Sequence, residues 1–186
     1  MLVGVVLTGG ASRRMGRTKA LVEVDGVPMA ARVAAALAGV GCESVVLFGG
    51  DPAELASLAL PVLPDRYRGE GPLGGVLGAL ELYEYRSDDV LIVACDMADI
   101  ASADLSRLVQ AAGEDADADV IVANGGRPEP ACALWRTAAT SRVRASFDGG
   151  ERAVHRVLAG LHTVEVSLPV ASLRNINTPD DLDRYS

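Results

Sequence analysis

The sequence predicts a Rossmann-like, doubly wound α/β fold with one mostly parallel sheet and an antiparallel edge. Two runs, residues 2–7 and 90–94, are almost continuously apolar, as expected for strands that are covered on both faces. Other segments carry apolar residues at helical spacing, for example Leu105, Leu108, Val109 and Ala112. Strand and helix alternate along the chain, which indicates parallel strands joined by crossover helices. No linker, repeat or low-complexity segment interrupts this pattern, so residues 1–186 are predicted to form a single domain.

The first half of the chain is predicted to alternate strands with short helices. A glycine-rich loop follows the strand at 2–7, and a short apolar piece at 21–24 ends at a turn, Asp25-Gly26. Pro28 suits the first position of a helix, which Gly39 or Gly41 would end. The next expected elements are a strand at 44–48, a short helix at 52–58 and a brief strand at 61–63.

The second half begins with another glycine-rich loop, 64–75, which leads into a helix at 73–85 and the strand at 90–94. Ser102 is expected to cap a helix. A strand at 119–123 and a turn at 124–126 lead into residues 131–135, which should pair back antiparallel. The remaining expected elements are helices at 137–147 and after Gly149, an edge strand at 163–166 and a short terminal helix from Thr178 and Pro179.

Charge is distributed unevenly. The net charge is −8, which argues against a nucleic-acid binder, because such proteins need a basic face. The glycine-rich loop after the first strand nevertheless carries four cations within seven residues and no acid: Arg13, Arg14, Arg17 and Lys19. One basic loop on an acidic protein indicates a focused anion site, although a solvated charge run is the plainer alternative.

The cysteines and the chain start bear on location. Cys42, Cys95 and Cys132 form no CxxC pair and lie in or beside apolar runs, as expected of free thiols in a reducing compartment. The N-terminal stretch has no basic segment before its apolar run, so no signal peptide is expected. The apolar runs are too short to cross a membrane. These features predict a cytoplasmic protein that does not associate with membranes.

The residues expected at the strand ends suit nucleotidyl transfer. Ligands of doubly wound sheets bind beyond the carboxyl ends of the strands. There, Gly9 and Gly10 would let the backbone approach a triphosphate. Arg13, Arg14 and Lys19 would hold its phosphates, and Asp96 is a hard oxygen ligand suited to Mg²⁺.

Other chemistries fit less well. The loop matches neither GxxxxGK[ST] nor GxGxxG, and no GxSxG occurs. His155 and His162 are expected to be structural or on the surface. Asp96 could instead cap a helix and Asp65 could be an ordinary turn residue. Structural turns are likewise the plainer interpretation of Gly71-Pro72-Leu73 and of Asn175 and Asn177.

Four segments in order resemble one family. LTGGASRRMGRTKALVEVDG is similar to the signature of the MobA-like nucleotidyltransferases, and GPLGG, CDM at 95–97 and NINTPDDL at 175–182 follow as in that family. DGGERAVHRVLAG is similar to its molybdenum cofactor guanylyltransferase members. The resemblance covers nearly the whole chain. It implies a nucleotide-diphospho-sugar transferase-like fold and transfer of GMP from GTP to molybdopterin, with Mg²⁺ and release of pyrophosphate.

The resemblance also implies roles for individual residues. Nucleotide contacts would come from Leu7, Gly9, Gly10, Lys19, Asp65, Gly71, Pro72, Leu73 and Asp96, with Asp96 also holding Mg²⁺. Arg13, Arg14, Lys19 and Asp96 would serve catalysis. The pterin side would use the 127–130 loop, with Arg127, Pro128 and Pro130, together with Asn175 and Asn177. GTP and molybdopterin are thus the implied partners, with molybdoenzymes or other cofactor-biosynthesis proteins as further candidates.

Two positions depart from the family pattern. Thr18 stands where the family usually has Asp, which would remove a carboxylate near the phosphates. The second strand ends in Gly49-Gly50-Asp51 where the family commonly has an Asn that fixes the nucleoside. Three alternatives stay open: a cytidylyltransferase on the same pterin, a guanylyltransferase on a small phosphorylated acid, and a non-catalytic nucleotide-binding accessory protein. The Gly9-Gly10 pair favours guanine, because cytidylyl relatives usually have Ala-Gly there.

Overall fold

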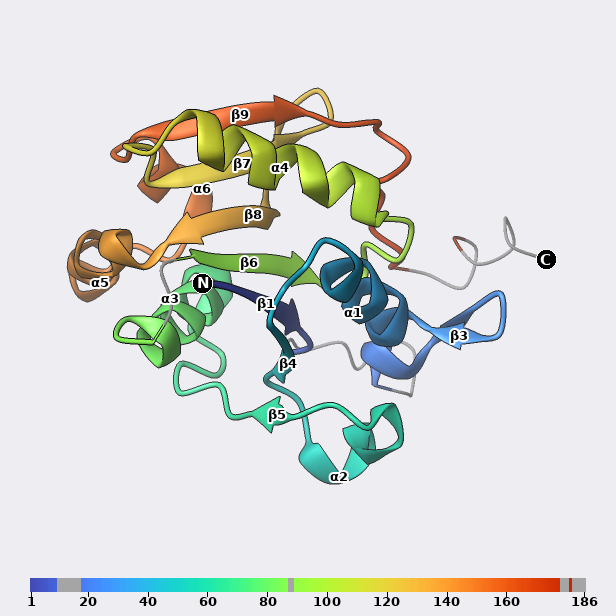
Figure 1. Cartoon of the computed structure of the whole chain (residues 1–186). Helices are drawn as coiled ribbons and strands as arrows, with labels where there is room; N and C mark the ends of the chain where they lie inside the picture. The colour runs from blue at the N-terminus through green and yellow to red at the C-terminus, as the bar shows by residue number, and fades with distance from the viewer. Residues whose placement is uncertain (10–17, 87–88, 178–180, 182–186) are drawn as a thin grey trace.

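The computed structural model describes residues 1–9, 18–86, 89–177 and 181. Seven of its strands form one sheet in the order β5-β4-β1-β6-β8-β7-β9 (Figure 1). Chain order and sheet order differ at several places, as in a doubly wound α/β fold, which confirms the predicted fold class. Among the described residues, no helix is both long and apolar enough to cross a membrane.

All strands of this sheet except one point the same way. The parallel strands are β1 (Leu2–Leu7), β4 (Ser44–Phe48), β5 (Val62–Leu63), β6 (Asp89–Ala94), β7 (Val120–Asn124) and β9 (Thr163–Ser167). The antiparallel strand, β8 (Pro128–Arg136), lies between β6 and β7 toward the β9 edge. The carboxyl ends of the six parallel strands and the start of β8 therefore share one rim of the sheet.

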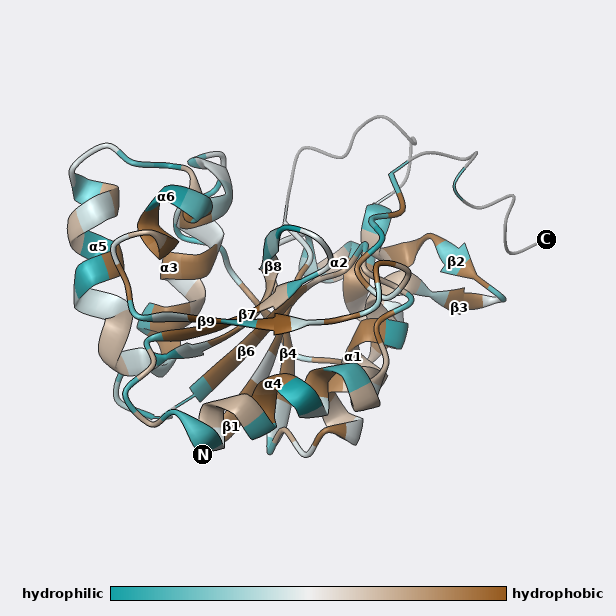
Figure 2. Cartoon of the chain, turned by 90° about the horizontal axis from the view of Figure 1, so that it is seen from above, coloured by the Kyte–Doolittle hydropathy of each residue, from teal (hydrophilic) through white to brown (hydrophobic). Residues whose placement is uncertain are grey.

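Helices cover both faces of the sheet, and Figure 2 shows the apolar strands between the two helical layers. One layer holds α1 (Met29–Gly39) and α4 (Ser102–Glu114). The other holds α3 (Gly71–Tyr83), α5 (Thr140–Asp148) and α6 (Val154–Leu158). Each layer buries its own aliphatic cluster against the sheet, for example Leu37 and Leu91 on one side and Leu77 and Ile92 on the other.

Shorter elements complete the described chain. A two-stranded hairpin of β2 (Glu23–Val24) and β3 (Val27–Pro28) precedes α1, and α2 (Pro52–Leu55) follows β4. Three 3₁₀ turns span Lys19–Leu21, Ala56–Leu58 and Thr137–Ala139. The predicted terminal helix starts at Thr178 and Pro179, outside the described residues.

Several predicted boundaries were wrong by a few residues. Pro28 belongs to β3 and caps α1 instead of opening it, because it pairs with Glu23 in the hairpin. Ser102 is the first residue of α4 and not its cap; a Cβ placed on Gly39 would lie 2.3 Å from the Ser102 hydroxyl oxygen, so this hydroxyl packs against α1. The capping contact comes instead from Asp104, whose carboxylate accepts the Ala101 N–H at 3.2 Å. Helix α3 begins at Gly71, and β8 begins at Pro128, earlier than expected.

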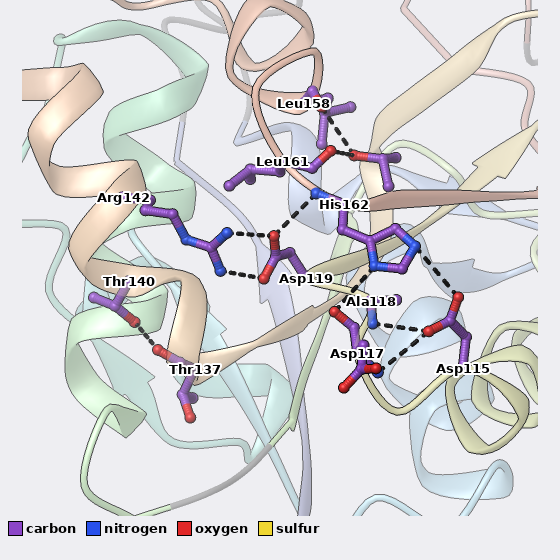
Figure 3. A network of polar contacts seen from close by, with 11 residues as sticks. Asp115, Asp117, Ala118, Asp119, Thr137, Thr140, Arg142, Leu158, Leu161 and His162 are labelled. Atoms are coloured by element: carbon purple, nitrogen blue, oxygen red, sulfur yellow. Dashed lines mark hydrogen bonds and ion pairs between the residues drawn. The ribbon is translucent and has the colours of Figure 1, made fainter.

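A polar network ties elements together at the end of the sheet opposite the rim (Figure 3). Asp119 precedes β7 and has a side chain only 9% exposed. Its carboxylate accepts two bonds from the Arg142 guanidinium of α5, one of them at 2.6 Å, and a third from the His162 backbone N–H at 2.9 Å. One buried carboxylate thus joins α5, the start of β7 and the segment before β9.

We expect Asp119→Ala to lower the free energy of unfolding by roughly 1–3 kcal/mol, because it leaves the partly buried His162 N–H and the Arg142 guanidinium without their acceptor. Urea denaturation followed by circular dichroism would measure this. Asp117→Ala is the matched control, since that side chain is exposed nearby and should change stability by less than about 0.5 kcal/mol. Equal effects of the two substitutions would show that the Asp119 network contributes little to stability.

Candidate active site

The carboxyl rim of the sheet gathers predicted residues from distant parts of the chain. Gly9 follows β1, Asp65 follows β5 and Asp96 follows β6, while Arg127 and Pro128 lie where β8 starts. Gly10, which was predicted to let the backbone approach the triphosphate, lies outside the described residues. The same is true of Arg13 and Arg14, which were predicted to hold phosphates, and of Arg17.

Lys19, Asp96 and Asn177 form a connected polar cluster at this rim. The Lys19 ammonium lies 2.5 Å from Asp96 Oδ2 and 2.7 Å from Asn177 Oδ1. The Lys19 and Asp96 side chains are only 13% and 20% exposed. The second Asp96 oxygen, Oδ1, is buried and has no hydrogen-bond partner among the described residues. The Lys19 ammonium therefore sits between two oxygen acceptors, with a third buried oxygen, Asp96 Oδ1, beside them.

Backbone contacts explain why Asn177 reaches this cluster. The Ile176 N–H donates to the Asp96 backbone carbonyl at 3.0 Å. The Ile176 side chain is fully buried in a small apolar cluster with Val24 and Met29. Asn175 lies half-buried two residues before Asn177 on the same segment. The C-terminal segment is thus anchored beside the end of β6, which brings both asparagines to the rim.

The ends of β1, β4 and β5 are packed backbone against backbone. Thr8 is buried, and its hydroxyl donates to the Gly49 carbonyl at 2.7 Å. Gly49 has φ of +84°, and a Cβ on it would lie 2.9 Å from Gly9 Cα, so a side chain is excluded here. Asp65 lies beside this contact, with one carboxylate oxygen accepting the Tyr67 N–H at 2.9 Å. The missing asparagine of the family pattern is therefore replaced by a close glycine pair.

The start of α3 is clamped to the loop before α6. The Leu73 N–H donates to the Arg152 carbonyl at 3.2 Å, and the Leu73 side chain is fully buried. Arg152 also binds Glu70 at 2.9 Å and lies 3.9 Å over the Phe147 ring centroid. Leu73 therefore positions the helix start, whereas Gly71 and Pro72 are exposed at it.

Thr18 contacts an acid from another part of the chain. The Thr18 hydroxyl donates to the Glu54 carboxylate, which comes from α2. That Thr18 removes a carboxylate near the phosphates stays a prediction.

A pocket of about 410 Å³ opens beside these residues. It is lined by Leu7, Pro72, Val76, Glu129, Pro130, Ala131, Ala153, Val154 and His155. Its walls join residues predicted for the nucleotide, Leu7 and Pro72, to Pro130, which was predicted for the pterin side. Glu129 lies in the 127–130 loop that the resemblance assigns to the pterin side, but no separate role was predicted for it, and His155 was expected to be structural or on the surface.

An irregularity in β8 determines the position of Glu129. Val122 of β7 pairs with Ala133, but the next residue, Ala123, pairs with Glu129 instead of Cys132, so the register shifts here. Pro130 has no N–H to give to the ladder, which favours such a bulge. Burial raises the pKa of the Glu129 carboxyl; the Ala131 N–H and Arg127 lower it, and Asp96 raises it.

The thiols near the rim are poor nucleophiles. Burial raises the pKa of Cys95 to about 12, with a further contribution from Asp96. Burial likewise raises the pKa of Cys132 to about 12. Because the thiolate is the reactive form, covalent catalysis by either cysteine is disfavoured at neutral pH.

A doubly wound sheet whose rim combines a glycine contact, a lysine, a strand-end aspartate and an asparagine defines a nucleotidyltransferase. Comparison with known proteins agrees. Residues 4–166 match the model of the MobA-like NTP transferase domain. The chain belongs to this family.

Named relatives cover nearly the whole chain. A molybdenum cofactor guanylyltransferase of Rhodobacter capsulatus is 37% identical over 187 residues, which covers 98% of this chain and 94% of the relative. A probable molybdenum cofactor guanylyltransferase of Mycobacterium marinum is 35% identical, covering 97% of this chain and 91% of the relative.

Solved structures give the same fold. Molybdopterin-guanine dinucleotide biosynthesis protein A from Archaeoglobus fulgidus superposes with a TM-score of 0.78 at 26% identity, covering 100% of this chain and 96% of that chain. The 2-C-methyl-D-erythritol 4-phosphate cytidylyltransferase of Thermus thermophilus has a TM-score of 0.73 at 19% identity, over 100% and 97% of the two chains, and shares the fold alone.

Proposed function

We propose that this protein transfers GMP from GTP to molybdopterin and releases pyrophosphate. The observation that carries the proposal is the Lys19 ammonium held between Asp96 and Asn177 at the strand ends. The similarity to molybdenum cofactor guanylyltransferases over nearly the full length supports this choice of substrates. The pocket that joins Leu7 and Pro72 to Pro130 gives room for a second substrate beside the nucleotide.

The residues present fit a magnesium ion. Asp96 Oδ1, Asp96 Oδ2 and Asn177 Oδ1 are hard oxygen donors, and Oδ1 of Asp96 is buried without a partner among the described residues. The described residues contain no cluster of three or more acidic, histidine or cysteine ligands, so phosphates and water would complete the shell. A bound magnesium ion would neutralise charge on the phosphates during transfer.

The chain's own groups would bind and orient the substrates. Lys19 would exchange the Asp96 carboxylate for phosphate oxygens of the triphosphate, to which its ammonium can donate charge-assisted hydrogen bonds. Gly9 and Gly49 pack backbone against backbone at the end of β1, so no side chain from Gly49 stands between β1 and β4 there. The acceptor's phosphate oxygen would attack the GTP α-phosphate in line as the bond to pyrophosphate breaks. Because a phosphate is already an anionic nucleophile, no protein base has to remove a proton.

Turnover assays would test the choice of triphosphate. With molybdopterin and Mg²⁺ present, we expect pyrophosphate release and a guanine dinucleotide product from GTP, and at least about tenfold less product from CTP. Mass spectrometry of the product and a coupled pyrophosphate assay would measure both. Preferred turnover of CTP would contradict the guanine assignment, and binding of GTP without turnover would point to an accessory protein.

We also propose that residues 1–186 act as a single domain in the cytoplasm. The seven strands that share one sheet support the first point. The second is supported by three free cysteines, two of them buried.

A further inference from the structure

The pocket beside Leu7 has a mostly apolar lining, unlike a phosphate-binding site. Seven of its nine lining residues are apolar, and the other two are Glu129 and His155. A half-buried carboxylate repels phosphates, so a phosphate group is a poor occupant. Apolar walls around a pocket of about 410 Å³ suit a flat heterocycle, since small-molecule pockets span roughly 300–1,000 Å³.

Glu129 is held in place to face such a ring. Prolines on both sides restrict its backbone, and the β8 irregularity takes residues 130–132 out of register with β7. One carboxylate oxygen, Oε1, accepts only a long bond, 3.4 Å, from the Ala131 N–H. Within the part of the chain that the structure describes, no cation forms an ion pair with this carboxylate, and Arg127 acts on it only through its charge. A partly desolvated acceptor therefore borders the pocket.

A carboxylate recognises one ring edge especially well. A 2-amino-4-oxopyrimidine ring presents a ring N–H and an exocyclic amine side by side, and two carboxylate oxygens can accept both. Guanine and pterin share this edge. The pocket lies between Leu7 at the end of β1 and Pro130 of β8, whereas Gly49 and Asp65 follow β4 and β5, toward the other edge of the sheet. The location thus favours the acceptor's pterin over the guanine base.

We propose that Glu129 determines acceptor specificity by accepting hydrogen bonds from the ring N–H and the 2-amino group of the pterin. This inference rests on the proposed function, because it gives the acceptor of that reaction its binding site. Pro72, Val76 and Val154 pack against the faces or edges of the ring, and the acceptor's phosphate extends toward Lys19 and Asp96.

Binding of small fluorescent rings to the whole protein tests the proposal without turnover. The probes are 6-hydroxymethylpterin and 6-hydroxymethyllumazine, which carries an oxygen in place of the 2-amino group. We expect the wild-type protein to prefer the pterin by about tenfold to a hundredfold, because a second oxygen would face the carboxylate. Glu129→Gln should lose most of that preference, since its amide can donate to the lumazine oxygen.

Two controls make the result specific. Glu129→Gln keeps an oxygen for the Ala131 N–H, so the fold should be retained, and Glu43→Gln removes the same charge from an exposed position at the other end of the sheet. Guanosine and GTP affinities should stay within about twofold of wild type in both variants. The proposal would be overturned if the ratio of pterin to lumazine affinities were unchanged in Glu129→Gln. It would also be overturned if this variant lost guanosine binding and not its preference for the pterin. Failure of the wild-type protein to turn over GTP would contradict the proposed function and leave this ratio measurable.

Discussion

Replacing Asp96 by Asn is expected to lower the rate of GMP transfer by about a hundredfold to a thousandfold, the usual effect of removing a group that stabilises transition-state charge. The substitution keeps the shape of the side chain but removes the charge that now holds Lys19 at 2.5 Å. It also removes an anionic oxygen ligand from the proposed magnesium site. Single-turnover transfer from GTP to molybdopterin would measure the effect on the chemical step.

The control for this experiment is Asp25→Asn on the β2–β3 turn. Its carboxylate is 56% exposed and binds Arg32 at 3.3 Å, whereas Asp96 binds Lys19. Thermal unfolding should show that both variants are folded. A carboxylate that only capped a helix would be dispensable for the reaction. If Asp96→Asn transferred GMP at the wild-type rate, Asp96 would be a structural residue and not a metal ligand.

The sequence predicted the site best where local pattern and position agree. The apolar run at 90–94 marks a buried strand, and an acid two residues after it must lie at the carboxyl rim, so Asp96 could be found from the sequence. The contact between Gly9 and Gly49 illustrates the limit. A Cβ on Gly49 would lie 2.9 Å from Gly9 Cα. This close approach depends on the register of the parallel strands β1 and β4, which no local sequence pattern predicts.

Long-range contacts account for what the sequence did not predict. Lys19 and Asn177 are 158 residues apart, yet they share a hydrogen bond. The resemblance assigned Lys19 to the nucleotide and Asn177 to the pterin, so it did not predict this contact. The hydrogen bond from Thr18 to Glu54 joins residues 36 positions apart in the chain. Glu129 reaches the pocket because β8 enters the sheet between β6 and β7 with a register shift. Strand order and bulges are tertiary properties, so the contacts that depend on them were not predicted.

Lys19→Ala should have two opposite effects, because Lys19 serves as a cation in the described structure and as a phosphate ligand in the proposed complex. Loss of charge-assisted hydrogen bonds should weaken GTP binding by roughly 1.5–3 kcal/mol. The same change frees the oxygens of Asp96 and Asn177, which the ammonium approaches to 2.5 and 2.7 Å. Binding of Mn²⁺ without nucleotide should therefore become tighter.

Calorimetry with GTP and electron paramagnetic resonance with Mn²⁺ would measure the two affinities separately. Arg32→Ala is a suitable control, because that cation pairs with Asp25 and donates to the Ala98 carbonyl without touching Asp96. A general loss of positive charge would weaken GTP binding in both variants. Only direct competition between the lysine and a metal ion predicts that Lys19→Ala alone gains Mn²⁺ affinity. If it loses affinity for both ligands, Lys19 orders the site instead of occupying it, and Asp96 would depend on Lys19 for its position.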